Sequence, residues 1–179
     1  MYTSRSMIVC AVLWSGTCTL PVEAAPDQPL RNASVTLQRS SCFGNCPAYS
    51  VTVTSDGQVS FEGHVHVQTG SARGHATPTQ FANILAVVEQ VGFRSMRDSY
   101  VSSDDGCVVL MSDQAGVKIT VVDTTGSKTV NFYNGCTGAT ADAARTGIQR
   151  LARSIDQQLA TARWIGKPAA PGDAGKTDR

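Results

Sequence analysis

The stretch Cys42-Phe43-Gly44-Asn45-Cys46-Pro47-Ala48-Tyr49 leads directly into an alternation of apolar and polar residues that continues to Thr54. An alternation with a period of two residues predicts a half-buried β-strand. Asp56-Gly57 follows, and this pair favours a tight hairpin turn, because both central positions of a type I′ turn need positive φ. The returning strand is predicted to face inward with Val59, Phe61, Val65 and Val67.

Working outward, residues 34–39 alternate in the same way and predict a strand before the cysteine loop. A first helix is predicted after the capping box Thr77-Pro78-Thr79-Gln80, with an apolar stripe from Phe81 to Val91 and Gly92 as its C-cap. Gly70 to Gly74 is interpreted as a break in the pattern before this helix. Residues 117–121 and 129–133 predict a second hairpin, and residues 140–162 predict a second helix. The predicted apolar stripe of this second helix is Ala144, Ile148, Leu151, Ile155 and Leu159.

The order of these elements predicts the fold class. Hairpins joined by single helices indicate an α+β domain, with a mostly antiparallel sheet built from two hairpins and two helices packed on one face. The chain of 179 residues is long enough for one domain with a real core. We assign this domain to residues 33–166.

Composition argues against nucleic acid as a partner. The formal net charge is +1, both signs are interspersed, and no basic face is indicated. Aromatic residues make up 6% of the chain, and Trp164 is expected outside the core, so a stacking platform for single strands is not predicted.

The first residues have the plan of an export signal. Arg5 stands in a short basic region, an apolar run covers residues 7–14, and small residues before Ala25 predict cleavage after Ala24. Residues 1–24 are therefore interpreted as a signal peptide, 25–32 as a polar lead-in and 167–179 as a disordered tail. We expect a periplasmic or secreted protein. As the alternative, residues 15–18 resemble a degraded lipobox, and lipidation at Cys18 would anchor the protein in the envelope.

Removal of the leader leaves Cys42, Cys46, Cys107 and Cys136, and disulfides are the expectation in an oxidising compartment. Four cysteines allow three pairings, among which spacing alone does not choose. For Cys42 with Cys46 we expect a structural disulfide. Cys107 can reach Cys136 if residues 108–113 approach the base of the second hairpin, but not if they form an equal third strand. We favour the bridge.

The cysteine pair also allows a chemical interpretation. A Cys-x3-Cys-Pro arrangement can hold Cu(I) or cycle between dithiol and disulfide, because two soft thiolates suit a soft cation. Such sites are typical where a strand enters a helix, whereas Cys46-Pro47 enters a predicted strand. His64 and His66 share a predicted strand face with Glu62 and could bind a metal, although that face is predicted to be the solvent side.

No catalytic constellation is evident. The chain has no Gly-x-Ser-x-Gly elbow and no phosphate-binding loop. Asp104 and Asp105 are interpreted as turn formers rather than a catalytic carboxylate pair. We assign no catalytic or cofactor-binding residue.

The chain resembles a bacterial family, domain of unknown function 6438. The residues that carry the resemblance are Cys42-Phe43-Gly44, Cys46-Pro47, Tyr49-Ser50-Val51, Asp56-Gly57, Val59, Phe61-Glu62-Gly63, Gly92-Phe93, Met96, Tyr100, Lys128-Thr129-Val130, Ile155-Asp156 and Thr161-Ala162-Arg163-Trp164. The resemblance implies an exported or lipid-anchored small domain with no established activity. Members usually have a shorter link after the tyrosine, and Cys107 and Cys136 depart from the family pattern.

The sequence therefore favours a non-enzymatic module of the bacterial envelope, whose exposed sheet face or cysteine loop contacts an envelope protein. The alternative is a periplasmic thiol-redox or copper-handling protein that uses Cys42 and Cys46, with His64 and His66 as further ligands. Contact with a membrane is expected only through lipidation at Cys18.

Overall fold

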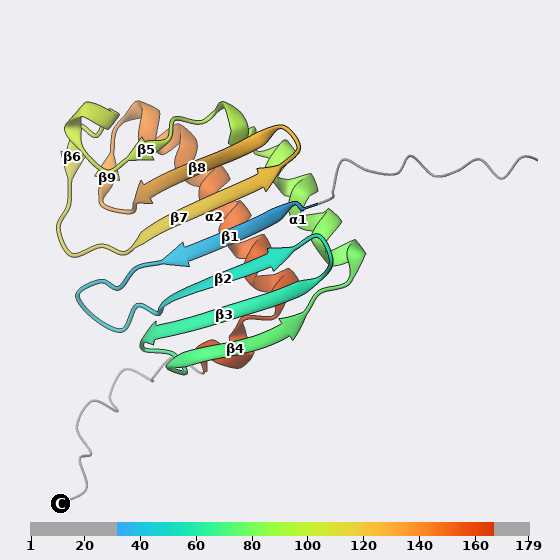
Figure 1. Ribbon diagram of the computed structural model, residues 1–179. Coiled ribbons are helices and arrows are strands. Elements are labelled where there is room, and N and C mark those ends of the chain that lie inside the picture. Colours follow the sequence, from blue (N-terminus) through green and yellow to red (C-terminus); the bar gives the residue numbers. More distant parts are fainter. Residues whose placement is uncertain (1–31, 167–179) are drawn as a thin grey trace, which may run out of the picture.

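The computed structural model describes residues 32–166 (Figure 1). The predicted signal peptide, the lead-in up to residue 31, Cys18 and the predicted tail lie outside the described residues. A seven-stranded sheet has the strand order β4-β3-β2-β1-β7-β8-β5, and a separate two-stranded sheet pairs β6 with β9. The strands are β1 (Ser34–Arg39), β2 (Ala48–Thr54), β3 (Gln58–Val65), β4 (Gly70–His75), β5 (Ser99–Tyr100), β6 (Val109–Leu110), β7 (Gly116–Asp123), β8 (Gly126–Tyr133) and β9 (Cys136–Thr137).

The mostly antiparallel α+β architecture is confirmed, but two hairpins account for only part of the sheet. All pairings in the large sheet are antiparallel except that of β5 with β8. β1 lies in the centre and joins the two hairpins, pairing Leu37 with Val51 of β2 and with Ile119 of β7. Residues 70–74, interpreted as a break, instead form edge strand β4, because their backbone pairs with β3.

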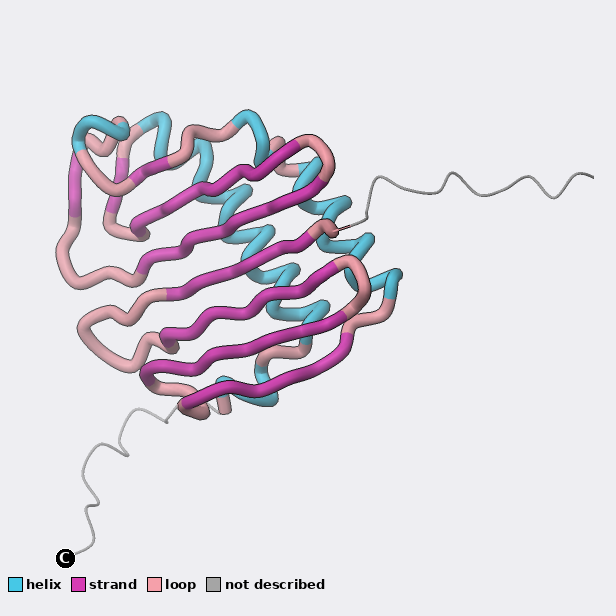
Figure 2. Tube along the Cα trace, in the orientation of Figure 1, coloured by secondary structure: helices cyan, strands magenta, loops and turns pink. Residues whose placement is uncertain are grey.

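The helices are α1 (Pro78–Gln90), α2 (Ala139–Leu159) and the single turn α3 (Ala162–Ile165), with 3-10 turns at Phe93–Ser95 and Ser103–Asp105. The predicted capping box starts α1, since Thr77 accepts from the Gln80 amide and Gln80 from the Thr77 amide. Gly92 follows with φ 62°, the left-handed conformation predicted for it. Figures 1 and 2 show α1 and α2 behind the same face of the sheet.

The core lies between this sheet face and the helices. The apolar stripe of α2 is buried, as its spacing predicts, at Ala144, Ile148, Leu151, Ile155 and Leu159. Two expectations about burial are wrong. Val65 is exposed near the end of β3, whereas Trp164 is buried and its ring stacks on Phe61 at 4.9 Å between centroids. α3 therefore closes the core beside β3 and β4.

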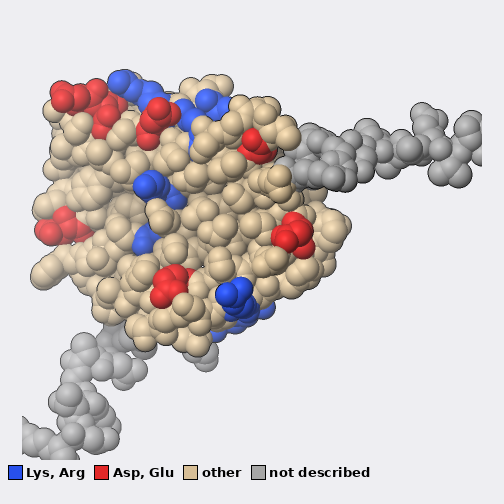
Figure 3. All heavy atoms as spheres, in the orientation of Figure 1, with Lys and Arg blue, Asp and Glu red and all other residues tan. Residues whose placement is uncertain are grey.

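The other face of the sheet is uncovered and polar. Hydroxyl side chains meet across the strands, as in the hydrogen bonds of Thr36 with Thr52 and of Thr120 with Thr129, both 2.9 Å. Figure 3 views this face and shows only scattered charges on it. Such a face is typical of a solvent-exposed antiparallel sheet. No helix within residues 32–166 is long and apolar enough to cross a membrane.

Candidate functional site at the disulfide end of the sheet

The loop between β1 and β2 is closed by a disulfide between Cys42 and Cys46, whose Cα atoms are 5.5 Å apart. At its tip the side chain of Phe43 is 90% exposed. The Phe43 amide donates to the Asp113 carbonyl over 3.1 Å, so the loop is also fixed to the segment before β7. The phenyl ring thus faces solvent, and the disulfide and this hydrogen bond restrain the backbone that carries it.

A second disulfide joins Cys107 to Cys136, with 5.1 Å between their Cα atoms. It sits where β6 pairs with β9, and the Val108 amide donates to the Thr137 carbonyl over 2.7 Å. The apolar run 108–111 is therefore an approach segment that forms its own small sheet. Its side chains are exposed rather than buried, so the described part of the chain leaves the outer side of β6 open.

Both disulfides lie at one end of the large sheet, on the left in Figure 1. Ser40 and Gly116 connect the two regions, since each donates from its backbone amide to the other residue over 3.1 and 2.6 Å. We call residues 42–46 and 107–113 the disulfide end. Its exposed large apolar side chains are Phe43, Val108, Val109, Leu110 and Met111.

Behind this end lies a network of polar side chains around Asp156 of α2. The Tyr49 hydroxyl donates to Asp156 Oδ1 over 2.6 Å, and Arg39 Nη2 donates to Oδ2 over 2.7 Å. Arg39 Nε also donates to the Tyr49 hydroxyl, and the Thr161 hydroxyl donates to Oδ1. The carboxylate is thereby satisfied from β1, β2 and the start of α3. This network ties α2 to the strands that carry the Cys42–Cys46 loop.

The surroundings of Tyr49 and Arg39 raise the pKa of both side chains. Burial, and then the charge of Asp156, raise the pKa of Tyr49 well above its usual value. Burial alone would lower the pKa of Arg39, but Asp156 and Tyr49 outweigh it and raise that pKa. At neutral pH the phenol is therefore protonated and the guanidinium charged. A phenol in this state is a poor general base, so the arrangement favours a structural role.

A pocket of about 320 Å³ opens between this network and the cysteine loop. Its apolar wall is formed by Cys46, Pro47, Ala115 and Ile165, and Arg39, Tyr49 and Asp156 form its polar side. The pocket lies close to Phe43 in sequence, since Cys46 in its wall is three residues further along the same loop. The disulfide end thus combines a projecting aromatic ring with a hollow.

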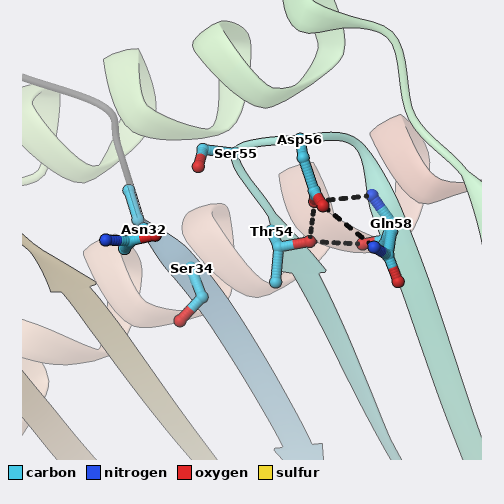
Figure 4. Close-up of a pocket in the computed structure, with 7 residues that line it drawn as sticks. Asn32, Ser34, Thr54, Ser55, Asp56 and Gln58 are labelled. Carbon is cyan, nitrogen blue, oxygen red and sulfur yellow. Dashed lines mark hydrogen bonds between the residues drawn. The ribbon is translucent and has the colours of Figure 1, made fainter. Parts of the chain in front are cut away.

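A second hollow, of about 390 Å³, lies at the opposite end of β1 beside the hairpin turn (Figure 4). Its polar side chains bond to one another: Gln58 Nε2 donates to Asp56 Oδ2 over 2.9 Å, and the Thr54 hydroxyl donates to Asp56 Oδ1. The hydrogen bond from Thr54 and those from Gln58 lower the pKa of Asp56. We interpret this hollow as part of the turn, because its carboxylate accepts hydrogen bonds from Thr54 and Gln58 on the two strands that the turn joins.

The predicted metal candidates lie in two places, the loop between β1 and β2 and the end of β3. Cys42 and Cys46 are joined to each other, and Cys46-Pro47 enters β2 rather than a helix. His64 is exposed at the end of β3, and His66 follows the strand with φ 54°, so the two do not continue one strand face. Among residues 32–166, no three His, Cys, Asp or Glu side chains are placed to share a metal ion.

Sequence reasoning missed the Arg39–Tyr49–Asp156 network. Tyr49 looked like one inward residue of a strand, and Asp156 like a polar neighbour of the apolar stripe. A signal was present, because both residues belong to the motifs that carry the family resemblance. Arg39 is not part of these motifs and so gave no such signal, although the register of β1 and β2 places it directly opposite Tyr49.

Above pH 10 we expect the free energy of unfolding of the wild-type protein to fall more steeply than that of Tyr49→Phe. The raised pKa means that the unfolded chain loses the phenolic proton first, at about pH 10. The contribution of Tyr49 is therefore complete below that pH and is lost as the pH rises beyond it. Urea unfolding at a series of alkaline pH values measures the difference, at most about 1.4 kcal/mol per pH unit. Parallel slopes would contradict the expectation.

Comparison with known proteins gives one result. The family model described as "Domain of unknown function (DUF6438)" matches residues 33–159. No curated protein matches the chain at a significant level.

Proposed function

The chain belongs to the DUF6438 family, and from this premise we propose that it is a non-enzymatic interaction module of the bacterial envelope. In this proposal the protein is exported to the periplasm or secreted, or is lipid-anchored through Cys18, and binds an envelope protein through the disulfide end. The disulfide end, rather than the polar sheet face, is the contact surface.

One observation carries the proposal. Of the seven large apolar side chains exposed within residues 32–166, five lie at the disulfide end. Apolar side chains gathered on a surface mark interaction sites more often than scattered ones do. Aromatic residues are enriched at interface cores, and the backbone that carries Phe43 is restrained before any partner arrives. An exposed ring on a restrained backbone is expected of a binding loop.

Two further observations support the proposal. The polar side chains of Arg39, Tyr49 and Asp156 behind the loop hydrogen-bond to one another, which supports a structural rather than a catalytic role. Paired disulfides are typical of proteins that work in oxidising compartments, which agrees with export. The copper or thiol-redox alternative needs Cys42 and Cys46 as free thiols that a reductant can reach.

A photo-crosslinking amino acid at position 43 tests the proposal in the bacterial host. We expect irradiation to join position 43 to a protein, while the same group at Arg153, exposed on α2, gives no adduct. We expect a stable contact with a partner at the disulfide end and none at the exposed surface of α2. No adduct from position 43, or the same adducts from both positions, would contradict the proposal.

The intact mass of the exported protein distinguishes the proposed function from the copper or thiol-redox alternative. Treatment with an alkylating reagent before reduction is expected to add no mass, because all four cysteines of the domain are paired. Alkylation of Cys42 and Cys46 after mild reduction of the folded protein, together with stoichiometric Cu(I) binding that Cys42→Ser abolishes, would favour the redox or copper function instead.

A further inference from the structure

Resting on the proposed contact surface, we propose that the partner of the disulfide end is a second copy of this chain. Each copy seats the ring of Phe43 in the pocket that Cys46, Pro47, Ala115 and Ile165 form in the other. The result is a twofold-symmetric dimer in which each pocket is completed by its partner.

The ring is prepared for insertion. Phe43 is 90% exposed, so the residues that the structure describes leave almost all of its surface open. The disulfide and the amide bond to Asp113 fix the loop, and little backbone entropy remains to be lost on binding. A preorganised aromatic side chain is the usual centre of a tight contact.

The pocket matches the ring in size and character. A cavity of about 150 Å³ lined by apolar groups is known to admit benzene, and this pocket measures about 320 Å³. Its wall of disulfide sulfur, proline ring, alanine methyl and isoleucine is apolar. The space therefore takes one phenyl ring together with part of the loop that carries it.

The position of ring and pocket on one loop decides the symmetry. A projecting side chain and a complementary pocket that lie far apart on a protein link molecules into open chains. When the two are adjacent, each of two molecules can insert its side chain into the pocket of the other around one twofold axis. Phe43 and Cys46 are three residues apart, so the second case applies. The contact is self-complementary and closes at two copies.

Charge complementarity supports the same pairing. Arg39 uses Nε and Nη2 for its hydrogen bonds, and its Nη1 makes none within residues 32–166. Asp113 accompanies the Phe43 loop, and its carboxylate accepts only from the Ser112 hydroxyl in the described part of the chain. When Phe43 of one copy enters the pocket, it brings this exposed carboxylate toward the guanidinium of the other. An Arg39 nitrogen without a hydrogen bond in residues 32–166 thus meets an exposed carboxylate whose one side-chain partner in that range is Ser112.

Sedimentation velocity of the exported protein, over a series of concentrations, tests the inference. We expect a monomer–dimer equilibrium whose Kd rises at least about tenfold in Phe43→Ala. Ala115→Leu is expected to do the same by filling the pocket. Asp113→Asn removes the charge at a residue with φ 64°, which asparagine also tolerates, and is expected to raise Kd about threefold.

The control is Val101→Ser, which removes another exposed apolar side chain outside the disulfide end and is expected to leave Kd unchanged. Circular dichroism checks that each variant is folded. A wild-type protein that is monomeric throughout, or a dimer that Phe43→Ala leaves intact, overturns the inference. So does a dimer that is lost in Val108→Ser but kept in Phe43→Ala, since β6 would then be the interface.

The crosslinking experiment distinguishes this inference from the proposed function. An adduct from position 43 with twice the mass of the chain supports both. An adduct only with a different protein overturns the dimer and retains the interaction module. Absence of any adduct contradicts both.

Discussion

Replacing Cys107 and Cys136 together with alanine is expected to lower the free energy of unfolding by about 3.5 kcal/mol. The disulfide closes a sequence separation of 29 residues, and in the chain-entropy model a loop of that length restricts the unfolded state by about this amount. Both sulfurs are buried, so lost packing adds to the effect. Urea unfolding of the oxidised protein and of the double variant gives the difference.

The matched control is Cys42→Ser with Cys46→Ser. Their sequence separation is only 4, for which the same model gives about 2 kcal/mol. The loop also keeps its bond from Phe43 to Asp113. An equal or larger loss in this variant would show that the short loop, and not the long one, is the main covalent support of the fold.

Asp156→Ala is expected to lower the free energy of unfolding by about 3 kcal/mol. The side chains of Arg39 and Asp156 are only 20% and 21% exposed. Removing the carboxylate leaves a largely buried guanidinium and the hydroxyls of Tyr49 and Thr161 without their shared acceptor. An uncompensated buried charge is costly, whereas loss of a surface pair is not. Urea unfolding at neutral pH measures the change.

Asp98→Ala provides the comparison, because Asp98 also pairs with a cation, Lys128, but is 83% exposed. We expect its loss to cost about 0.5 kcal/mol or less. If Asp156→Ala were equally mild, the Arg39–Tyr49–Asp156 network would not be what fastens α2 to the sheet.

The sequence predicted the features that depend on contacts between residues close to one another in the chain. Thr77 and Gln80 mark the start of α1 because capping is a contact between neighbours in sequence. The alternation around Val51 and the Asp56-Gly57 turn gave the β2–β3 hairpin for the same reason. The stripe of α2 was correct in every member, since a helix that packs on a sheet must bury one face.

Pairings between distant segments left no such signal. β4 contains two glycines and no apolar alternation, and its hydrogen bonds to β3 make it a strand. The apolar run 108–111 allows two interpretations, a strand or a buried approach segment, and the exposure of its side chains depends on how the rest of the fold is placed. The Asp156 network, likewise, joins residues that only the folded sheet and α2 bring together.

The central place of β1 has a consequence for how the molecule is made. Of the strands that the structure describes, β1 is synthesised first, and its second neighbour arrives late, since Ser34 pairs with Val122. Until β7 is synthesised, β1 with Val35 and Leu37 has one edge whose backbone groups are unpaired. Such an edge can pair with strands of other chains. Contacts so distant in sequence also slow folding. A growing chain of this protein thus carries its greatest aggregation hazard before β7 emerges, and a holding chaperone that shields β1 would raise the yield of folded protein.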